Sequence, residues 1–309
     1  MGIMNRPIAI VGPTCTGKSV LALRLAEKLG GEIVNGDAMQ LYYGMNIGTA
    51  KLSLVKRKNI PHYQIDILNI KSTSTAADYQ NHALNIIESI TSRGLVPILV
   101  GGSMLYVQSV LDNWSFPITD IDVRSSWENK LSRVGTTALH SELNILDPVA
   151  GKSICIKDSR RLVRALEVIE LTGNLFSTPI SKINKPKWDT LIVGLDLETN
   201  VLNSRLWKRT SMMFNHGLVD EVRKLINIGF HDELTAAKAL GYAQILKELN
   251  KTRTVNLNFS AACSATFIST KRYAKRQRAW FRRDHRINWL DGTNTQLTND
   301  IFHMWRTSF

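Results

Sequence analysis

The residues best suited to chemistry form a phosphate-binding loop near the amino terminus. This loop matches G-x-x-x-x-G-K-[ST] at every fixed position, and its residues are Gly12, Pro13, Thr14, Cys15, Thr16, Gly17, Lys18 and Ser19. Glycines allow backbone N–H groups to curl around an anion, and a following helix adds the positive end of its dipole. Lys18 supplies a point charge, and the Ser19 hydroxyl can ligate Mg²⁺. The loop therefore predicts a site for a diphosphate or triphosphate with Mg²⁺.

A carboxylate, Asp37, is the second candidate. Most P-loops hold ATP or GTP, and such proteins usually end a neighbouring strand with an acid that helps to hold Mg²⁺. Here the apolar strand at 96–100 ends in Gly101, Gly102 and Ser103 instead, and the acid follows an earlier strand as Asp37. Small-molecule kinases of this fold class commonly place an acceptor-facing residue there. Because Asn-Gly-Asp is also good turn composition, a turn-capping role for Asp37 stays open.

Short apolar strands alternate with amphipathic helices around these candidates. Residues 8–11, 32–34 and 96–100 predict strands, and residues 20–29 and 104–111 predict helices. The alternation is typical of an α/β protein, a P-loop NTPase-like parallel sheet with helices on both faces. In such a sheet the carboxyl ends of the strands lie along one edge. We therefore expect the P-loop, Asp37 and Ser103 to converge.

The pattern changes in the middle of the chain. From about Pro117 to Lys187 there are no strong strands, and helices are predicted at 127–134, 137–146 and 159–171. Pro179 and Pro186, with the lysines between them, predict a return linker. A strand at 190–195 then resumes the sheet before a mainly helical remainder. We therefore predict a P-loop core in two parts, 1–116 and 189–309, with a helical insertion at 117–188.

The charge of the chain points to a polyanionic partner. The formal net charge is +13, and residues 271–286 contain eight basic residues and one acid. A field of this sign favours nucleic acid or phosphorylated ligands. Lys271, Lys275, Arg278 and Arg282 recur at helical spacing, which suits binding to a phosphate backbone. The alternative is a solvated basic face on a helix that Trp280 and Phe281 anchor to the core.

The sequence gives little support for a disulfide framework, a zinc site, a membrane span or a signal peptide. The three cysteines lie far apart, which suits a reducing cytosol, and the seven histidines include no i, i+4 pair that could start a zinc site. No apolar run approaches the roughly 18 residues of a membrane span, and the run after Pro7 is too short for a signal peptide. We expect a cytoplasmic protein with no membrane partner. Nothing in the sequence demands more than a monomer.

Motifs along the whole chain resemble the tRNA dimethylallyltransferase family, also called tRNA isopentenyltransferases, in its short bacterial form. Besides the P-loop, the matching segments are 37–42, 44–51, 61–67, 77–79, 101–106, 161–168, 202–213, 241–244, 271–283 and 289–291. Their order and spacing agree throughout. Two departures stand out: many members have serine in place of Ala38 and threonine in place of Ser103. Ser103 keeps the hydroxyl that threonine has at that position, whereas Ala38 lacks the hydroxyl of serine.

The resemblance implies a specific reaction. The family moves a dimethylallyl group from its diphosphate to the exocyclic N6 amine of the adenosine just 3′ of the tRNA anticodon, and it releases pyrophosphate. The P-loop would then grip a diphosphate, and Mg²⁺ on Ser19 would assist. Asp37 would be the catalytic base, and Ser103 would stabilise the leaving group together with Lys18. Arg205 would bind the diphosphate, with Arg209 as a second candidate; a solvated helix charge is the alternative.

The resemblance also implies where the anticodon stem-loop binds. The target adenosine must leave its stack to react, and the neighbouring loop bases can then be read at their edges. Gln40 is suited to polar reading and Tyr242 to stacking, although a plain core role for Tyr242 is equally open. The implied tRNA contacts are Asp37, Ala38, Met39, Gln40, Ser103, Arg124, Arg160, Arg161, Leu162, Val163, Arg164, Lys238, Gly241, Tyr242 and Gln244.

Two other interpretations share some of these features. A P-loop kinase for a small, nucleotide-like molecule would also have an acceptor-side Asp37. The missing strand-end acid and the basic carboxyl-terminal helix argue against it. A non-catalytic P-loop RNA-binding protein would share the charge, but it would tolerate replacement of Asp37.

Overall fold

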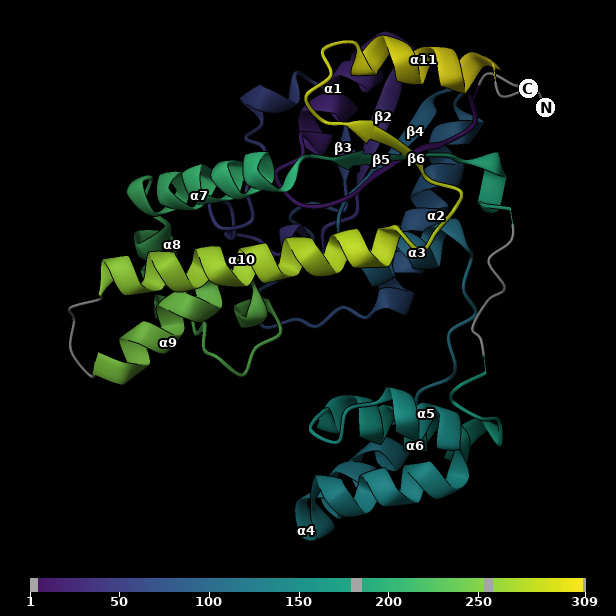
Figure 1. Ribbon diagram of the computed structural model, residues 1–309, viewed down its shortest axis with the longest axis vertical. Helices are drawn as coiled ribbons and strands as arrows, with labels where there is room; N and C mark the ends of the chain where they lie inside the picture. Colours follow the sequence, from purple (N-terminus) through teal and green to yellow (C-terminus); the bar gives the residue numbers. More distant parts are fainter. Residues whose placement is uncertain (1–4, 179–184, 253–257, 308–309) are drawn as a thin grey trace. The chain divides into compact units, whose positions relative to one another are not determined.

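A computed structural model describes residues 5–178, 185–252 and 258–307. Within them, six strands form one sheet in the order β3-β2-β4-β1-β5-β6, and every neighbouring pair is parallel (Figure 1). The strands are β1 (Ile8–Val11), β2 (Gly31–Asn35), β3 (His62–Tyr63), β4 (Val96–Val100), β5 (Leu191–Asp196) and β6 (Asn288–Asp291). The predicted α/β fold is confirmed.

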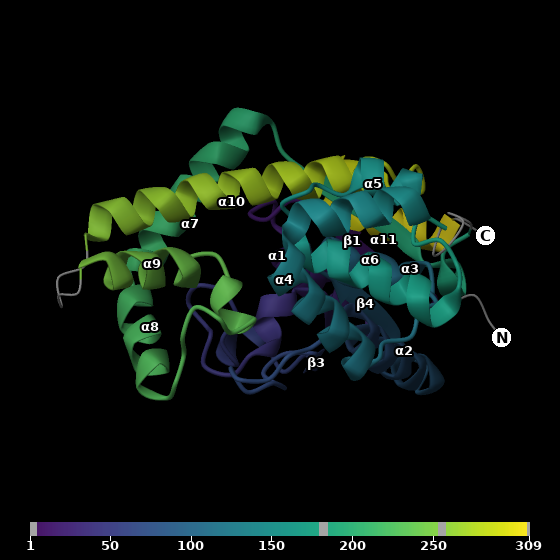
Figure 2. The same ribbon diagram turned by 90° about the horizontal axis from the view of Figure 1, so that it is seen from below.

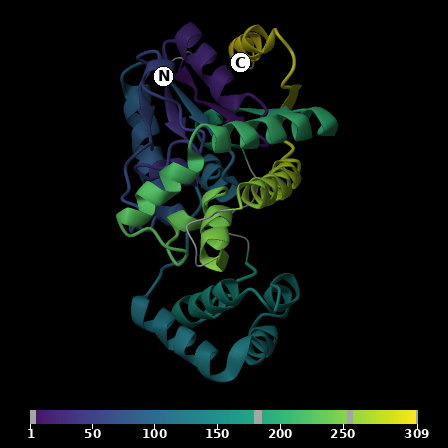
Figure 3. The same cartoon turned by 90° about the vertical axis from the view of Figure 1, so that its left-hand side faces the viewer.

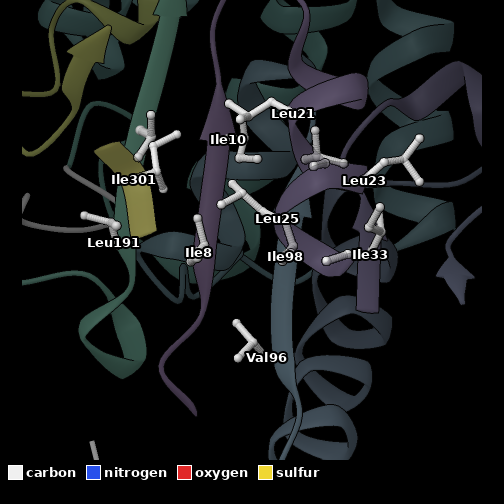
Figure 4. Packing of buried hydrophobic residues seen from close by; sticks show 14 of the residues in the cluster. Ile8, Ile10, Leu21, Leu23, Leu25, Ile33, Val96, Ile98, Leu191 and Ile301 are labelled. Carbon is white, nitrogen blue, oxygen red and sulfur yellow. The ribbon is translucent and has the colours of Figure 1, made fainter. Parts of the chain in front are cut away.

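The central strand, β1, shows why both faces of the sheet must be covered. All four of its residues are buried, and successive side chains point to opposite faces. Ile8 and Ile10 pack with Leu21 and Leu25 on one face (Figure 4). Ala9 and Val11 belong to the core on the other face. A strand buried on both sides reads as a continuous apolar run, which explains why it was predictable.

Helices complete the layers on the two faces. Helix α1 (Lys18–Leu29) and helix α11 (Leu297–Thr307) cover the face that carries Ile8, whereas α2 (Ala76–Ser92) and α3 (Met104–Leu111) cover the other. The two short edge strands, β3 and β6, were not predicted. A strand of two residues, and one whose side chains are largely exposed, leave little apolar pattern in the sequence.

A second group of helices flanks the carboxyl edge of the sheet. Its elements are α7 (Thr199–Asn215), α8 (Leu218–Asn227), α9 (Tyr242–Thr252) and α10 (Phe259–Phe281). Among the described residues, 3₁₀ helices lie at Ala38–Leu41, Val55–Arg57, Lys187–Asp189 and Ala236–Lys238. Helix α7 packs across α10 (Figure 3), and α9 packs against α10 (Figure 2). Together with α8 they bury an apolar cluster that includes Phe214, Leu218 and Ile245.

Residues 114–184 form a separate helical unit, and residues 1–113 with 185–309 form the other. The predicted insertion was 117–188, and most of its predicted return linker, 179–184, lies outside the described residues. The unit contains α4 (Ile121–Leu146), α5 (Pro148–Ser153) and α6 (Ser159–Thr172). Helix α4 consists of two helical segments that meet at Gly135, whose backbone is not helical (φ 80°, ψ 171°). The two helices predicted at 127–134 and 137–146 are therefore confirmed, although the first begins earlier, at Ile121. In the part of the chain that the structure describes, no helix has both the length and the apolar character that crossing a membrane requires.

Candidate active site

The P-loop joins β1 to α1, and its own side chains hold it in shape. Lys18 donates from Nζ to the carbonyl oxygens of Gly12 (2.9 Å) and Pro13 (2.5 Å). The buried Thr16 hydroxyl also donates to Pro13 O (2.9 Å). Burial and the nearby Arg209 lower the pKa of Lys18 to about 8. The loop is therefore preformed, with a partly desolvated cation at its centre.

A cavity of about 750 Å³ opens beside the P-loop, a size typical of small-molecule sites. All of its lining residues belong to the unit that contains the sheet. The predicted convergence holds, because Lys18, Asp37 and Ser103 follow three different strands and all line this cavity. Predicted residues that line it are Thr14, Cys15, Gly17, Lys18, Ser19, Asp37, Ala38, Met39, Gln40, Ser103, Arg205 and Lys238.

Asp37 caps the short helix that follows it and also faces the cavity. Its Oδ1 accepts a hydrogen bond from the Met39 N–H (2.9 Å), and its own N–H donates to Asn35 Oδ1 (3.0 Å). The turn-capping and cavity-facing interpretations are therefore both true. Burial raises the pKa of Asp37, and the Met39 N–H and Lys18 oppose that rise. A raised pKa makes the carboxylate a stronger base, which suits proton abstraction near neutral pH.

Ser103 links two strand ends. Its hydroxyl oxygen accepts from the Ala38 N–H (2.9 Å), and its own N–H donates to Gly36 O (3.1 Å). Beside it lies Tyr273 of α10, a residue that the sequence analysis did not single out. Burial, with Asp37 nearby, raises the pKa of Tyr273 to about 12, so this phenol stays protonated.

Two arginines of α7, Arg205 and Arg209, line the same cavity as Asp37. Arg209 donates from Nη2 to the Thr14 hydroxyl (2.8 Å) and is partly buried. Arg205, the first choice from the sequence, is exposed. With Lys18 they form a cationic wall that suits a diphosphate. Ser19 is exposed at the start of α1, and its hydroxyl is a hard oxygen donor of the kind that Mg²⁺ prefers alongside phosphate and water.

The segment predicted to read the anticodon loop lies partly at the cavity and partly in the core. Gln40 donates from Nε2 to Thr49 O (3.0 Å) at the cavity wall. Gln244 accepts from the Gly241 N–H (2.8 Å). Tyr242 is 0% exposed, and its hydroxyl donates to Glu221 (2.5 Å). Its predicted stacking role is wrong for this structure, because the ring is enclosed in the apolar cluster; the core alternative applies.

In the helical unit, several predicted RNA contacts are engaged within the protein. Glu167 is 0% exposed, and its Oε2 accepts from Arg124 (2.8 Å) and Arg164 (2.9 Å). These two arginines compensate a buried carboxylate, a role that the sequence did not predict. Leu162 and Val163 pack in the core of the unit, so their side chains are not available to RNA. Arg160 and Arg161 are exposed on the same helix, α6.

The basic face of α10 is also partly engaged. Arg278 donates from Nη2 to Asp196 (2.8 Å) and to Leu197 O (2.9 Å), and Arg282 pairs with the same Asp196 (3.0 Å). Phe281 is buried and anchors the helix, as the alternative interpretation held. Lys271 and Lys275 are exposed. Of the four residues predicted to bind phosphates, Arg278 and Arg282 therefore form ion pairs within the protein, and Lys271 and Lys275 face solvent.

Comparison with known proteins decides the family. The family model described as IPP transferase matches residues 40–284. The chain belongs to the IPP transferase family. Similar members include the tRNA dimethylallyltransferase of Mycolicibacterium smegmatis, 54% identical over 98% of this chain and 99% of that protein. The protein of the same name from Mycobacterium tuberculosis is 51% identical over 97% of this chain and 99% of its own length.

Solved structures of IPP transferase relatives share the fold. The tRNA isopentenylpyrophosphate transferase of Bacillus halodurans aligns with a TM-score of 0.70 at 34% identity, over 98% of this chain and 95% of that one. A eukaryotic dimethylallyltransferase, studied acting on tRNA, aligns with a TM-score of 0.79 at 26% identity, over 97% of this chain and 77% of its own. The sequence-based identification of the family, and of the protein as a transferase, is confirmed.

Besides Tyr273, two residues that contact the site or its neighbouring segments were not predicted from the sequence. Glu221 lies on α8 and accepts from the backbone N–H groups of Asn46 (3.0 Å) and Ile47 (2.9 Å). Gln277 lies on α10 and is 2% exposed. No local spacing marks either of them, because their partners are distant in sequence. In the sequence, Gln277 differs from its neighbours only as an uncharged residue within a run of basic ones.

Proposed function

We propose that this protein transfers a dimethylallyl group from dimethylallyl diphosphate to N6 of the adenosine 3′-adjacent to the anticodon in tRNA. Pyrophosphate is the second product. One observation carries the proposal: the Asp37 carboxylate and the cationic wall of Lys18, Arg205 and Arg209 line the same cavity. A base on one side and a diphosphate grip on the other suit a displacement between them. The names of the relatives support tRNA as the acceptor.

The residues divide the work as follows. The N6 amine attacks C1 of the allyl group, the C1–O bond breaks, and its electron pair leaves with pyrophosphate. Asp37 takes the proton that the amine loses. Lys18 and Arg209 stabilise the charge that develops on the leaving oxygen, where preorganised donors lower the barrier most. Bound Mg²⁺ would neutralise further charge on the phosphates, and Ser19 would hold it.

A transfer assay tests the proposal. The protein is incubated with radiolabelled dimethylallyl diphosphate, Mg²⁺ and unmodified tRNA that reads codons beginning with U, and the label is followed into tRNA. Label in wild-type reactions and its loss with Asp37→Asn are the expected results. Absence of transfer, together with ATP consumption stimulated by a small acceptor, would indicate the kinase instead. Full transfer by the Asp37→Asn variant would exclude Asp37 as the base.

The proposal also includes a setting for the reaction. The protein would act as a monomer in the cytoplasm, where tRNA is processed, and nothing in its sequence demands a second copy. Light scattering of the purified protein during size-exclusion chromatography checks the monomer. A dimer that persists at assay concentrations would contradict it.

A further inference from the structure

The side-chain amide of Gln277 joins two loops of the active site. Its Oε1 accepts from the Thr14 N–H (2.9 Å), and its Nε2 donates to Gly102 O (2.8 Å). Thr14 belongs to the P-loop, and Gly102 belongs to the turn that ends β4. Both lie far from Gln277 in sequence but line the same cavity. The oxygen and the nitrogen of this buried amide thus both form hydrogen bonds with backbone groups of the site.

The fit around the amide is close. A Cβ added at Gly102 would overlap Gln277 Nε2, so the glycine leaves the space that the amide occupies. The hydroxyl of Tyr273, one turn earlier on α10, reaches the same Gly102 carbonyl (3.3 Å). Two side chains of one helix therefore hold one carbonyl group in place. Close packing of this kind leaves little freedom for the turn.

Each loop that Gln277 holds continues to a group with a proposed role. On one side, the Thr14 hydroxyl accepts from Arg209. On the other side, Gly102 precedes Ser103, whose hydroxyl oxygen accepts from the N–H of Ala38, next to Asp37. Gln277 thus connects the loop proposed to bind the diphosphate with the turn that leads to Ser103 and Asp37. The distance between these two halves must be set to within an ångström for efficient transfer.

We propose that Gln277 is the positioning residue that sets the P-loop and the Asp37 side of the cavity relative to each other. This inference rests on the proposed function, because it deepens the account of the same site. At neutral pH the amide supplies one acceptor and one donor at this place, which an ionised carboxylate cannot do. A glutamate of equal length still accepts from Thr14, but its second oxygen faces the Gly102 carbonyl. A methionine fills the volume and makes neither bond.

The test compares Gln277→Met and Gln277→Glu with a matched control, Gln80→Met. Gln80 is also buried and also donates to a backbone carbonyl, that of Ser109 (2.9 Å), but it does not line the cavity. We expect Gln277→Met to lower kcat about 10- to 100-fold, to raise the KM for dimethylallyl diphosphate, and to leave the KM for tRNA nearly unchanged. Gln80→Met should leave all three constants near wild type.

A pH profile separates positioning from general destabilisation. Protonation of the carboxylate introduced by Gln277→Glu restores one donor and one acceptor, so the activity of this variant relative to wild type should rise as the pH falls toward about 6. A flat ratio would overturn the inference. So would wild-type constants in Gln277→Met, or an equal loss of kcat in Gln80→Met.

Calorimetry with inorganic pyrophosphate keeps the two proposals apart. If wild-type protein transfers no label, the proposed function fails, but pyrophosphate binding still reports on the P-loop. Gln277→Met should then bind pyrophosphate about tenfold more weakly than wild type, and Gln80→Met should bind it equally well. Equal affinity in wild type and Gln277→Met would overturn the positioning role, whatever the reaction.

Discussion

Arg209 donates a hydrogen bond to the hydroxyl of Thr14 and so fastens α7 to the P-loop. Arg205, one turn earlier, lines the same cavity but is exposed. A partly buried guanidinium binds phosphate more strongly than one in contact with water, because solvent screens the latter. The structure therefore shifts the expected diphosphate contact from Arg205 toward Arg209.

Replacement of Arg209 should weaken donor binding more than replacement of Arg205. We expect Arg209→Ala to raise the KM for dimethylallyl diphosphate roughly 10- to 100-fold, the range of one charge-assisted hydrogen bond. Arg205→Ala should have a smaller effect, and the exposed Lys208→Ala should serve as the control on the same helix. Steady-state kinetics at saturating tRNA measures all three. A larger effect at Arg205 would restore the interpretation drawn from the sequence.

Removal of the Asp37 carboxylate should reduce the chemical step and spare tRNA affinity. We expect Asp37→Ala and Asp37→Asn each to lower kcat by roughly 10² to 10⁴, the contribution of a general base. The asparagine oxygen can still accept from the Met39 N–H. This variant therefore loses the proton-accepting carboxylate but keeps the side chain that caps the short helix. Single-turnover rates and tRNA filter binding provide the two readouts. Collapse of tRNA affinity in the asparagine variant would make Asp37 mainly a binding residue.

The pH dependence of kcat/KM for the donor should be bell-shaped. Asp37 acts when deprotonated, so activity is lost as the pH falls through a pKa that burial has raised. Lys18 acts when protonated, so activity is lost as the pH rises through about 8. A Lys18→Arg variant keeps its charge to higher pH, and its alkaline limb should move upward. An unchanged alkaline limb in that variant would assign it to another group.

Glu221 should hold the backbone of segment 44–51 in its conformation. Its carboxylate accepts from the N–H groups of Asn46 and Ile47 and from the Tyr242 hydroxyl. Glu221→Ala leaves these donors unpaired, and we expect the free energy of unfolding to fall by about 2–3 kcal/mol. Because Thr49 of this segment holds Gln40, the KM for tRNA should also rise.

Denaturant unfolding and steady-state kinetics check these two effects of Glu221. Glu233→Ala is the matched control, because that side chain is exposed and its loss should change stability by less than about 0.5 kcal/mol. A Glu221→Ala protein that unfolds like wild type would show that water replaces the carboxylate at no cost.

The sequence predicts what depends on neighbours along the chain. The P-loop, the strands β1 and β4, and the meeting of Asp37 with Ser103 all follow from local patterns and from the geometry of a parallel sheet. The pairing of Arg124 with Glu167, and of Gln277 with Thr14, depends on contacts between distant segments, which no period of 2 or 3.6 residues reveals. Tyr242 shows a related limit, because an aromatic residue suits a core and a binding face equally well.

Asp196 has a consequence for how tRNA binding should respond to salt. It neutralises Arg278 and pairs with Arg282 at the end of the helix that has most basic residues. Cations already matched by a carboxylate displace few counterions from a nucleic acid. The number of ions released on tRNA binding should therefore be smaller than a count of lysines and arginines implies, and the contribution of α10 should come mainly from its exposed cations Lys271, Arg272, Lys275 and Arg276.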